Sequence, residues 1–106
     1  MVREVKTKGE FETCLAEAGS KLVVVDFFAT WCGPCKHIAP KIEELESSNP
    51  DVVFLKVDID VVEDLAVDFN ISCMPTFLFF KHKTKIDEFS GANEIKIVEI
   101  VQKHKN

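Results

Sequence analysis

Residues 22–29 constrain the fold of this chain more than any other stretch, because they form an apolar run that has no polar face. Their sequence is Leu-Val-Val-Val-Asp-Phe-Phe-Ala, in which only Asp26 is polar. β-Branched and aromatic residues favour strands, and a strand without polar–apolar alternation is typical of a parallel sheet that is buried on both faces. Residues 52–58 form a second run of this kind. We therefore expect a sheet with helices on both of its faces.

The remaining elements are predicted from apolar spacing and from residues that begin or end helices. The first three expected strands need crossover connections and should be parallel, whereas the last two form an antiparallel hairpin. The predicted fold is thus α/β with a mixed sheet, and 106 residues correspond to a single domain, residues 1–106. The expected strands are residues 1–5, 22–29, 52–58, 76–81 and 85–89, and the expected helices lie between Thr7 and Gly19, at 34–47, at 60–69 and after Asn93.

Two local features are expected to disturb these elements. Pro40 lies inside the helix predicted at 34–47, where its missing amide hydrogen and its ring should kink the helix. The hairpin turn at residues 81–85 reads Lys-His-Lys-Thr-Lys and lacks the glycine or asparagine that tight turns prefer. Either this loop is longer, or one of its residues adopts a positive φ at an energetic cost.

The charge of the chain argues against two classes of partner. Its 13 Lys and Arg residues are outnumbered by 18 Asp and Glu residues, so that the net charge is -5. Proteins that bind nucleic acids or anionic membranes usually carry a basic patch, and we expect neither partner here. The N-terminal residues are charged where a signal peptide would be apolar, and the longest apolar run is too short to cross a bilayer. The expected location is the cytosol, where thiols stay reduced.

Two of the four cysteines, Cys32 and Cys35, are separated by two residues where a predicted strand meets a predicted helix. The thiolate is the attacking species in thiol–disulfide exchange, and the amide groups and dipole at a helix start favour it. We expect Cys32, just before the helix, to be the exposed nucleophile with a low pKa. Cys35, one turn in, should be the covered resolving thiol. Lys36 adds positive charge that solvent screens.

The two residues between the cysteines bear on geometry and on redox direction. Gly33 lets another chain approach closely, and Pro34 stiffens the turn and suits the first turn of a helix. Because neither residue is charged or a strong hydrogen-bond donor, the pair is predicted to work as a reductant rather than an oxidant.

Two other interpretations of the pair are weaker. A disulfide that only stabilises the fold would close a very small loop, which contributes about 2 kcal/mol in the chain-entropy model. Half of a zinc site would need two further ligands, and the sequence has no second Cys-x-x-Cys motif or His pair. The chain also lacks a glycine-rich nucleotide loop. We therefore expect neither a metal site nor a cofactor.

Asp26 is the only polar residue in the apolar run, where an ionised carboxylate is costly unless it is paired. Burial is expected to raise its pKa, which suits a group that transfers protons near neutral pH. The alternative is a hydrogen-bonded buried acid without a catalytic task.

Three segments of the chain form a specific combination. They are the apolar run with Trp31-Cys32-Gly33-Pro34-Cys35-Lys36, the triplet Met74-Pro75-Thr76, and Gly91-Ala92-Asn93. This combination resembles the thioredoxin family, and its animal cytosolic members in particular, over essentially the whole chain. The resemblance implies the thioredoxin fold, a five-stranded mixed sheet flanked by four helices. It also implies a dithiol–disulfide oxidoreductase that reduces protein disulfides through Cys32 and Cys35 and serves cell redox homeostasis.

The resemblance further implies roles for individual residues. The Met74–Pro75 peptide should be cis and face Cys32, which would leave the backbone of Met74 free to pair with an extended substrate segment. Asp26 would take the proton of Cys35, directly or through a water. Trp31 would shape the docking surface, with core packing as the alternative. The residues expected to bind substrate or shape the site are Trp31, Gly33, Pro34, Met74, Pro75, Thr76, Gly91 and Ala92.

Other residues are expected to modulate the site or to lie outside it. Lys56 either shares the pocket of Asp26 or is a solvated lysine. Cys73, beside Met74, either forms an intermolecular disulfide or is modified reversibly, or it is a thiol without a role in the reaction. Cys14 is expected in the core, and His37, His82 and His104 are expected to be exposed. The full set of expected modulators is Lys36, Lys56, Asp58, Asp60 and Cys73.

The partners implied by the resemblance are thioredoxin reductase, an NADPH-dependent flavoenzyme that restores the dithiol, and proteins with disulfides. Examples of such substrates are peroxiredoxins, ribonucleotide reductase and methionine sulfoxide reductases. The protein is expected as a monomer, or as a dimer linked through Cys73, in the cytoplasm and also in the nucleus. Two other functions remain as alternatives. One is a disulfide isomerase or oxidase, for which a secretory signal and other residues between the cysteines would be expected. The other is an interaction module without turnover.

Overall fold

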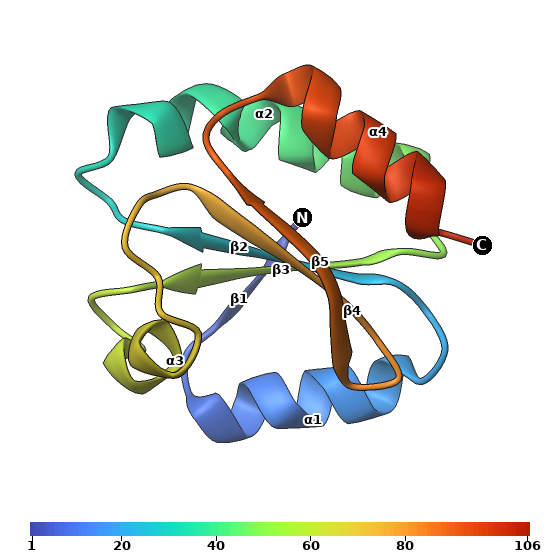
Figure 1. The fold of residues 1–106 in the computed structure, drawn as a ribbon, viewed down its shortest axis with the longest axis horizontal. Helices are drawn as coiled ribbons and strands as arrows, with labels where there is room; N and C mark the ends of the chain where they lie inside the picture. Colours follow the sequence, from blue (N-terminus) through green and yellow to red (C-terminus); the bar gives the residue numbers. More distant parts are fainter.

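Five strands form one mixed sheet that lies between two layers of helices (Figure 1). The computed structural model describes residues 1–106. The sheet order is β1-β3-β2-β4-β5, in which β3 is parallel to β1 and β2, and β4 is antiparallel to β2 and β5. The predicted mixed sheet with four helices is confirmed. The strands are β1 (Arg3–Val5), β2 (Val23–Phe28), β3 (Val53–Asp58), β4 (Thr76–Lys81) and β5 (Thr84–Ser90), and the helices are α1 (Lys8–Ala18), α2 (Gly33–Ser48), α3 (Glu63–Asp68) and α4 (Glu94–His104).

The central strand β2 is buried on both faces, as predicted. Val23 and Val25 belong to the core that the sheet shares with α1 and α3, whereas Val24 belongs to the core beneath α2 and α4. Figure 1 shows these two pairs of helices on opposite faces of the sheet. Because successive side chains of a strand point to opposite faces, Asp26 points to the same face as Val24. This alternation places Asp26 on the side of α2, the helix that begins at the dithiol.

Three of the helices begin at a residue whose side chain accepts an amide hydrogen bond. Thr7 and Asn93 hold this position before α1 and α4, as predicted. Cys32 holds it before α2, where its sulfur accepts a hydrogen bond from the amide of Cys35. The start of α2 is thus fixed by one of the two cysteines of the dithiol.

The helix α3 is shorter than the helix predicted at 60–69, because Asp58 accepts three amide hydrogen bonds in front of it. Its Oδ1 accepts from the amide of Asp60 at 2.9 Å, and its carbonyl oxygen accepts from those of Val61 and Val62 at 3.1 and 2.9 Å. The chain is therefore a turn at these positions and becomes helical only at Glu63.

No helix is both long and apolar enough to cross a membrane.

The hairpin between β4 and β5 closes through a two-residue turn in which both residues adopt a positive φ. Lys81 pairs with Thr84, and the residues between them, His82 and Lys83, have φ angles of 51° and 65°. The strained tight turn is therefore the correct alternative, with two residues at positive φ rather than one.

Pro40 and His104 were each the subject of an expectation from the sequence. Pro40 lies inside α2, which runs from Gly33 to Ser48, so this proline does not end the helix. The prediction that His104 is exposed is wrong, because its side chain is half-buried beside Asp87, with Nε2 and Oδ2 3.0 Å apart.

Candidate active site

Cys32 and Cys35 are joined by a disulfide at the start of α2. Cys32 precedes the helix in an extended conformation, and Cys35 lies in its first turn together with Pro34. The amide of Cys35 donates a hydrogen bond to Cys32 Sγ, with nitrogen and sulfur 3.1 Å apart. A thiolate formed at Cys32 on reduction would receive the same hydrogen bond, which favours its ionised form.

Both cysteines are buried in this disulfide form, with 6% of Cys32 and 5% of Cys35 exposed. The prediction that Cys32 is exposed is therefore wrong for the oxidised protein, because its sulfur is bonded to Cys35 and lies 3.7 Å from the carbonyl oxygen of Met74. The two cysteines differ in their surroundings instead. Cys32 stands between the exposed residues Trp31 and Gly33, whereas Cys35 lines a cavity.

This cavity has a volume of about 290 Å³ and lies between the sheet and the first turns of α2. Asp26 and Lys56 are direct partners in the parallel register of β2 and β3, so their side chains point to the same face. The structure thus brings Asp26, Lys56 and Cys35 together at one cavity. The residues that line it are Asp26, Phe28, Ala29, Thr30, Cys35, Lys36, Ala39 and Lys56.

One of these lining residues, Lys56, was predicted at the site, and another, Ala39, was not. Lys56 is half-buried, with Nζ 5.8 Å from the centroid of the Phe28 ring, so the alternative of a lysine that shares the cavity of Asp26 is the correct one. Ala39 follows Cys35 by one helical turn, and its small side chain leaves the cavity open. A small residue four positions after the second cysteine is the signal that could have identified it.

The carboxyl group of Asp26 is buried and incompletely hydrogen-bonded. Only 7% of the residue is exposed, and Oδ1 has no hydrogen-bond partner. Burial raises the pKa of Asp26 from 3.8 to about 7, while the positive charge of Lys56 acts in the opposite direction. A carboxyl group with this pKa is present in both protonation states near neutral pH, so it can accept and return a proton there.

Beside the disulfide, the segment before β4 is hydrogen-bonded to the segment after β5. The Met74–Pro75 peptide is cis, as the family resemblance implies. The amide of Gly91 donates a hydrogen bond to the carbonyl oxygen of Pro75 at 2.9 Å. Gly91 has a φ of 103°, a conformation that side chains rarely tolerate, so glycine is required where the chain meets Pro75. Ala92 follows directly.

Thr76 connects the same two segments through its hydroxyl group. Its Oγ1 donates to the carbonyl oxygen of Cys73 at 2.5 Å, so Ser90 Oγ, 2.9 Å away, must be the donor in its contact with Thr76. Ser90 was not predicted as a site residue. It lies opposite Thr76 in the register of β4 and β5, and only knowledge of that register could have identified it.

Trp31 is 66% exposed, so the alternative that it packs in the core is wrong. Its indole Nε1 donates a hydrogen bond to Asp60 Oδ2 at 2.9 Å. Asp60 in turn donates its amide hydrogen to the buried carboxylate of Asp58. The two aspartates predicted as modulators thus hold the indole at the surface beside Cys32.

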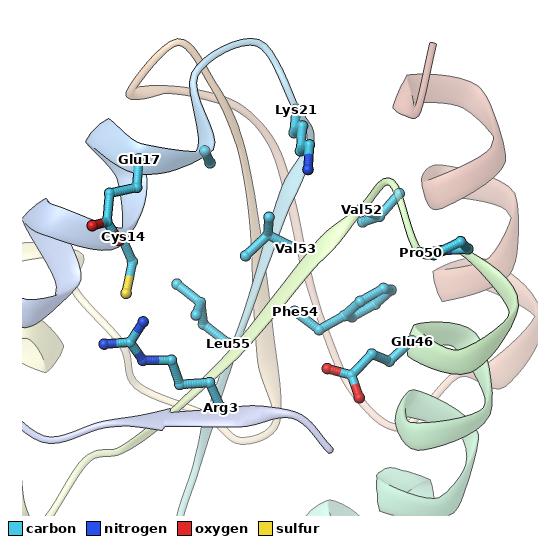
Figure 2. Close-up of a pocket in the computed structure, with 11 residues that line it drawn as sticks. Arg3, Cys14, Glu17, Lys21, Glu46, Pro50, Val52, Val53, Phe54 and Leu55 are labelled. Atoms are coloured by element: carbon cyan, nitrogen blue, oxygen red, sulfur yellow. The ribbon is translucent and has the colours of Figure 1, made fainter.

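The other two cysteines lie in different places. Cys73 is an exposed free thiol next to Met74, at the edge of the site. Cys14 is buried in the core, as predicted, and burial raises the pKa of its thiol. Cys14 lines a separate hollow of about 360 Å³. Figure 2 shows this residue on α1, opposite residues of β3 and of the end of α2. Cys14 is therefore not part of the redox site.

Comparison with known proteins gives a consistent result. The family model for thioredoxin matches residues 2–103. A thioredoxin of Equus caballus is 53% identical over 97 residues, which cover 92% of each chain, and one of Ophiophagus hannah is 49% identical over 98% of this chain and 99% of its own. Among solved structures, Fasciola hepatica thioredoxin superposes with a TM-score of 0.96 at 46% identity and covers 98% of this chain and 100% of its own.

Proposed function

The chain belongs to the thioredoxin family and is a dithiol–disulfide oxidoreductase, and from this premise we propose that it reduces the disulfides of partner proteins with distinct roles for its two cysteines. The observation that carries the proposal is the asymmetry of the pair. Cys32 accepts an amide hydrogen bond at the rim of the site, and Cys35 lines the cavity that contains Asp26.

Cys32 is the nucleophile in this proposal. Its thiolate attacks one sulfur of the substrate disulfide, the substrate S–S bond breaks, and the second substrate sulfur leaves as a thiolate that takes up a proton. Cys35 then attacks the sulfur of Cys32 in the mixed disulfide and releases the first substrate sulfur. Two electrons pass from the dithiol to the substrate, and the protein is left with the Cys32–Cys35 disulfide present in this structure.

Asp26 is the base that makes Cys35 reactive. A neutral Cys35 thiol is a poor nucleophile, and Asp26 is the carboxyl group in the cavity that this cysteine lines. Its pKa of about 7 and the free Oδ1 support this role, since a proton accepted near neutral pH needs an acceptor that is partly ionised. The positive charge of Lys56, at the same cavity, lowers the pKa of Asp26, and Lys36 lines the cavity from the exposed first turn of α2.

The substrate docks on the surface around Cys32. Trp31, Gly33 and Pro34 are exposed there, and the carbonyl oxygen of Met74, 3.7 Å from Cys32 Sγ, is available to an extended substrate backbone. On the other side of Met74, the hydrogen bond between Gly91 and Pro75 holds Ala92 beside the same surface. Residues that support this arrangement are Thr76, Asp58 and Asp60, and Cys73 is the thiol open to modification at its edge.

Thioredoxin family members act with thioredoxin reductase and with disulfide substrates. We propose that the NADPH-dependent reductase restores this dithiol and that peroxiredoxins, ribonucleotide reductase and methionine sulfoxide reductases are its substrates. The protein acts as one domain, residues 1–106, in the cytoplasm and the nucleus, as a monomer or as a dimer linked through Cys73.

The decisive experiment uses the Cys35→Ser variant, which cannot resolve a mixed disulfide. This variant should form stable mixed disulfides with many cell proteins through Cys32, and these should disappear in a Cys32→Ser control. Partner binding that persists in Cys32→Ser without any mixed disulfide would show that the protein is an interaction module. Recycling is tested separately, by following NADPH oxidation with thioredoxin reductase and a protein disulfide.

A further inference from the structure

Ile95 is an exposed aliphatic side chain in the first turn of α4, with 73% of the residue accessible to solvent. A single exposed aliphatic residue is ordinary and needs no explanation by itself. Ile95 differs because it lies between two hollows of the surface. One is lined by residues 91–95, and the other, of about 330 Å³, is lined by Lys41, Glu94, Ile95, Val98 and Glu99.

The first of these hollows is continuous with the proposed docking surface. Gly91 and Ala92 line it, and Gly91 is hydrogen-bonded to Pro75, whose neighbour Met74 contacts Cys32. Gly91 and Ala92 therefore connect the segment that contacts Cys32 with the hollow that Ile95 lines, and neither carries a large side chain.

The second hollow is lined by both apolar and acidic residues. Ile95 and Val98 lie on one face of α4, since residues three apart in a helix are neighbours. Glu94 and Glu99 also line the hollow, with Glu94 Oε2 3.5 Å from His37 Nε2, and the single cation that lines it, Lys41, is paired with Glu44 at 3.3 Å. The site thus complements an apolar side chain that is accompanied by a basic one.

We infer that Ile95 is a specificity-determining residue, and that this surface favours protein substrates in which an aliphatic side chain beside a Lys or Arg lies a few residues from the target cysteine. This inference rests on the proposed function, because it extends the docking surface of the same site. Burial of the aliphatic side chain against Ile95 and Val98 supplies the affinity, and the two glutamates select the basic neighbour.

The test uses the Cys35→Ser variant and synthetic peptides that carry one cysteine as a mixed disulfide with thionitrobenzoate. Attack of the Cys32 thiolate on the peptide sulfur breaks the S–S bond, releases the coloured thionitrobenzoate anion and leaves the peptide bound to Cys32. One peptide series carries Leu-Arg at a spacing of about two to five residues on either side of the cysteine, a range that an extended chain covers in steps of about 3.3 Å. The matched series carries Ser-Glu.

At the best spacing, Leu-Arg peptides should react about tenfold faster than Ser-Glu peptides, which corresponds to about 1.4 kcal/mol. Ile95→Ser should reduce this ratio to about two, and the double change Glu94→Gln and Glu99→Gln should also reduce it, because these side chains no longer favour Arg over Glu. Ile86→Ser, a change of the same residue type on β5, is the matched control and should keep the full ratio.

Two kinds of failure are distinguishable. A ratio near one at every spacing, or a full ratio in Ile95→Ser, overturns the role of Ile95 while the release of thionitrobenzoate still supports Cys32 as the nucleophile. Absence of release from every peptide, and from the small disulfide dithiobis(nitrobenzoate), overturns the proposed function and with it this inference.

Discussion

Removal of the buried carboxyl group at Asp26 should stabilise the fold at neutral pH while it slows the redox reaction. The replacements are Asp26→Asn, which keeps the size of the side chain, and Asp26→Ala. The structure suggests the direction, because Asp26 is 7% exposed and its Oδ1 has no hydrogen-bond partner. A group with these properties costs free energy when it is ionised inside the protein.

The magnitude follows from the pKa of Asp26 in the two states. In the unfolded chain the carboxyl group ionises near its ordinary value of 3.8, whereas in the folded protein it ionises at about 7. Between these values only the unfolded chain loses the proton, so the free energy of unfolding falls as the pH rises. The two pKa values correspond to a loss of about 4 kcal/mol in total, at about 1.4 kcal/mol for each pH unit. Above pH 7 the loss is complete.

The assay is urea unfolding of the oxidised protein and of Asp26→Asn between pH 4 and pH 8. The oxidised form is used so that neither Cys32 nor Cys35 titrates. The stability of the variant relative to the wild type should rise by up to about 4 kcal/mol between pH 4 and pH 8. The cost of burying an amide in the same cavity shifts this difference equally at every pH and leaves its pH dependence unchanged. Asp51→Asn, which removes an exposed carboxylate, should give a difference that does not follow this curve.

A stability difference between Asp26→Asn and the wild type that stays constant from pH 4 to pH 8 would refute the reasoning, because it would show that folding does not raise the pKa of Asp26. The effect of the same variant on the redox reaction is measured in a separate experiment. Asp26→Asn should slow resolution of the mixed disulfide near pH 7, and unchanged turnover together with lower stability would make Asp26 a structural residue only.

Three further predictions concern the scaffold. Lys83→Gly, at a φ of 65°, should raise the free energy of unfolding by about 1 kcal/mol in urea titrations, because glycine adopts this conformation without strain. Phe77→Ala, which empties a fully buried site beside the Phe89 ring, should lower it by about 3–5 kcal/mol in the same assay. The hydrogen bond with His104 lowers the pKa of Asp87, so Asp87→Asn should destabilise the protein at neutral pH, and this difference should vanish as acid titration protonates the wild-type carboxylate.

The long apolar runs made the centre of the fold predictable from the sequence. Strands predicted at 22–29 and 52–58 correspond to β2 and β3, because burial on both faces requires apolar residues at nearly every position. The helix ends were less predictable where a polar side chain competes for backbone amides. Asp58 shortened the predicted helix at 60–69 in this way, and no apolar periodicity reports such a contact.

The site was predictable in its chemistry but not in its surroundings. The positions of Cys32 and Cys35 at a helix start follow from local sequence. The face to which Asp26 points does not, because a run that is apolar on both sides carries no mark of which side is which. The roles of Lys56 and Ser90 depend on strand register, and that of Ala39 on the space left between a helix and the sheet. Strand register and the packing of a helix on a sheet belong to the tertiary structure, so they are known only from a family resemblance or from a structure.

The tight turn at His82 and Lys83 carries a local energetic cost, because its sequence lacks the glycine or asparagine that such turns prefer. Two non-glycine residues at positive φ cost about 1–2 kcal/mol each. A longer loop would avoid this cost but would free the register between β4 and β5, and a shift by one residue would turn the buried side chains of the strand to the wrong face. The pairing shifts by one residue at an irregularity between Phe79 and Phe80, and beyond it Thr76 lies opposite Ser90, next to the segment whose Met74 contacts Cys32. The strained turn and the shift at Phe79 and Phe80 therefore together set the pairing at the end of the hairpin that borders the redox site.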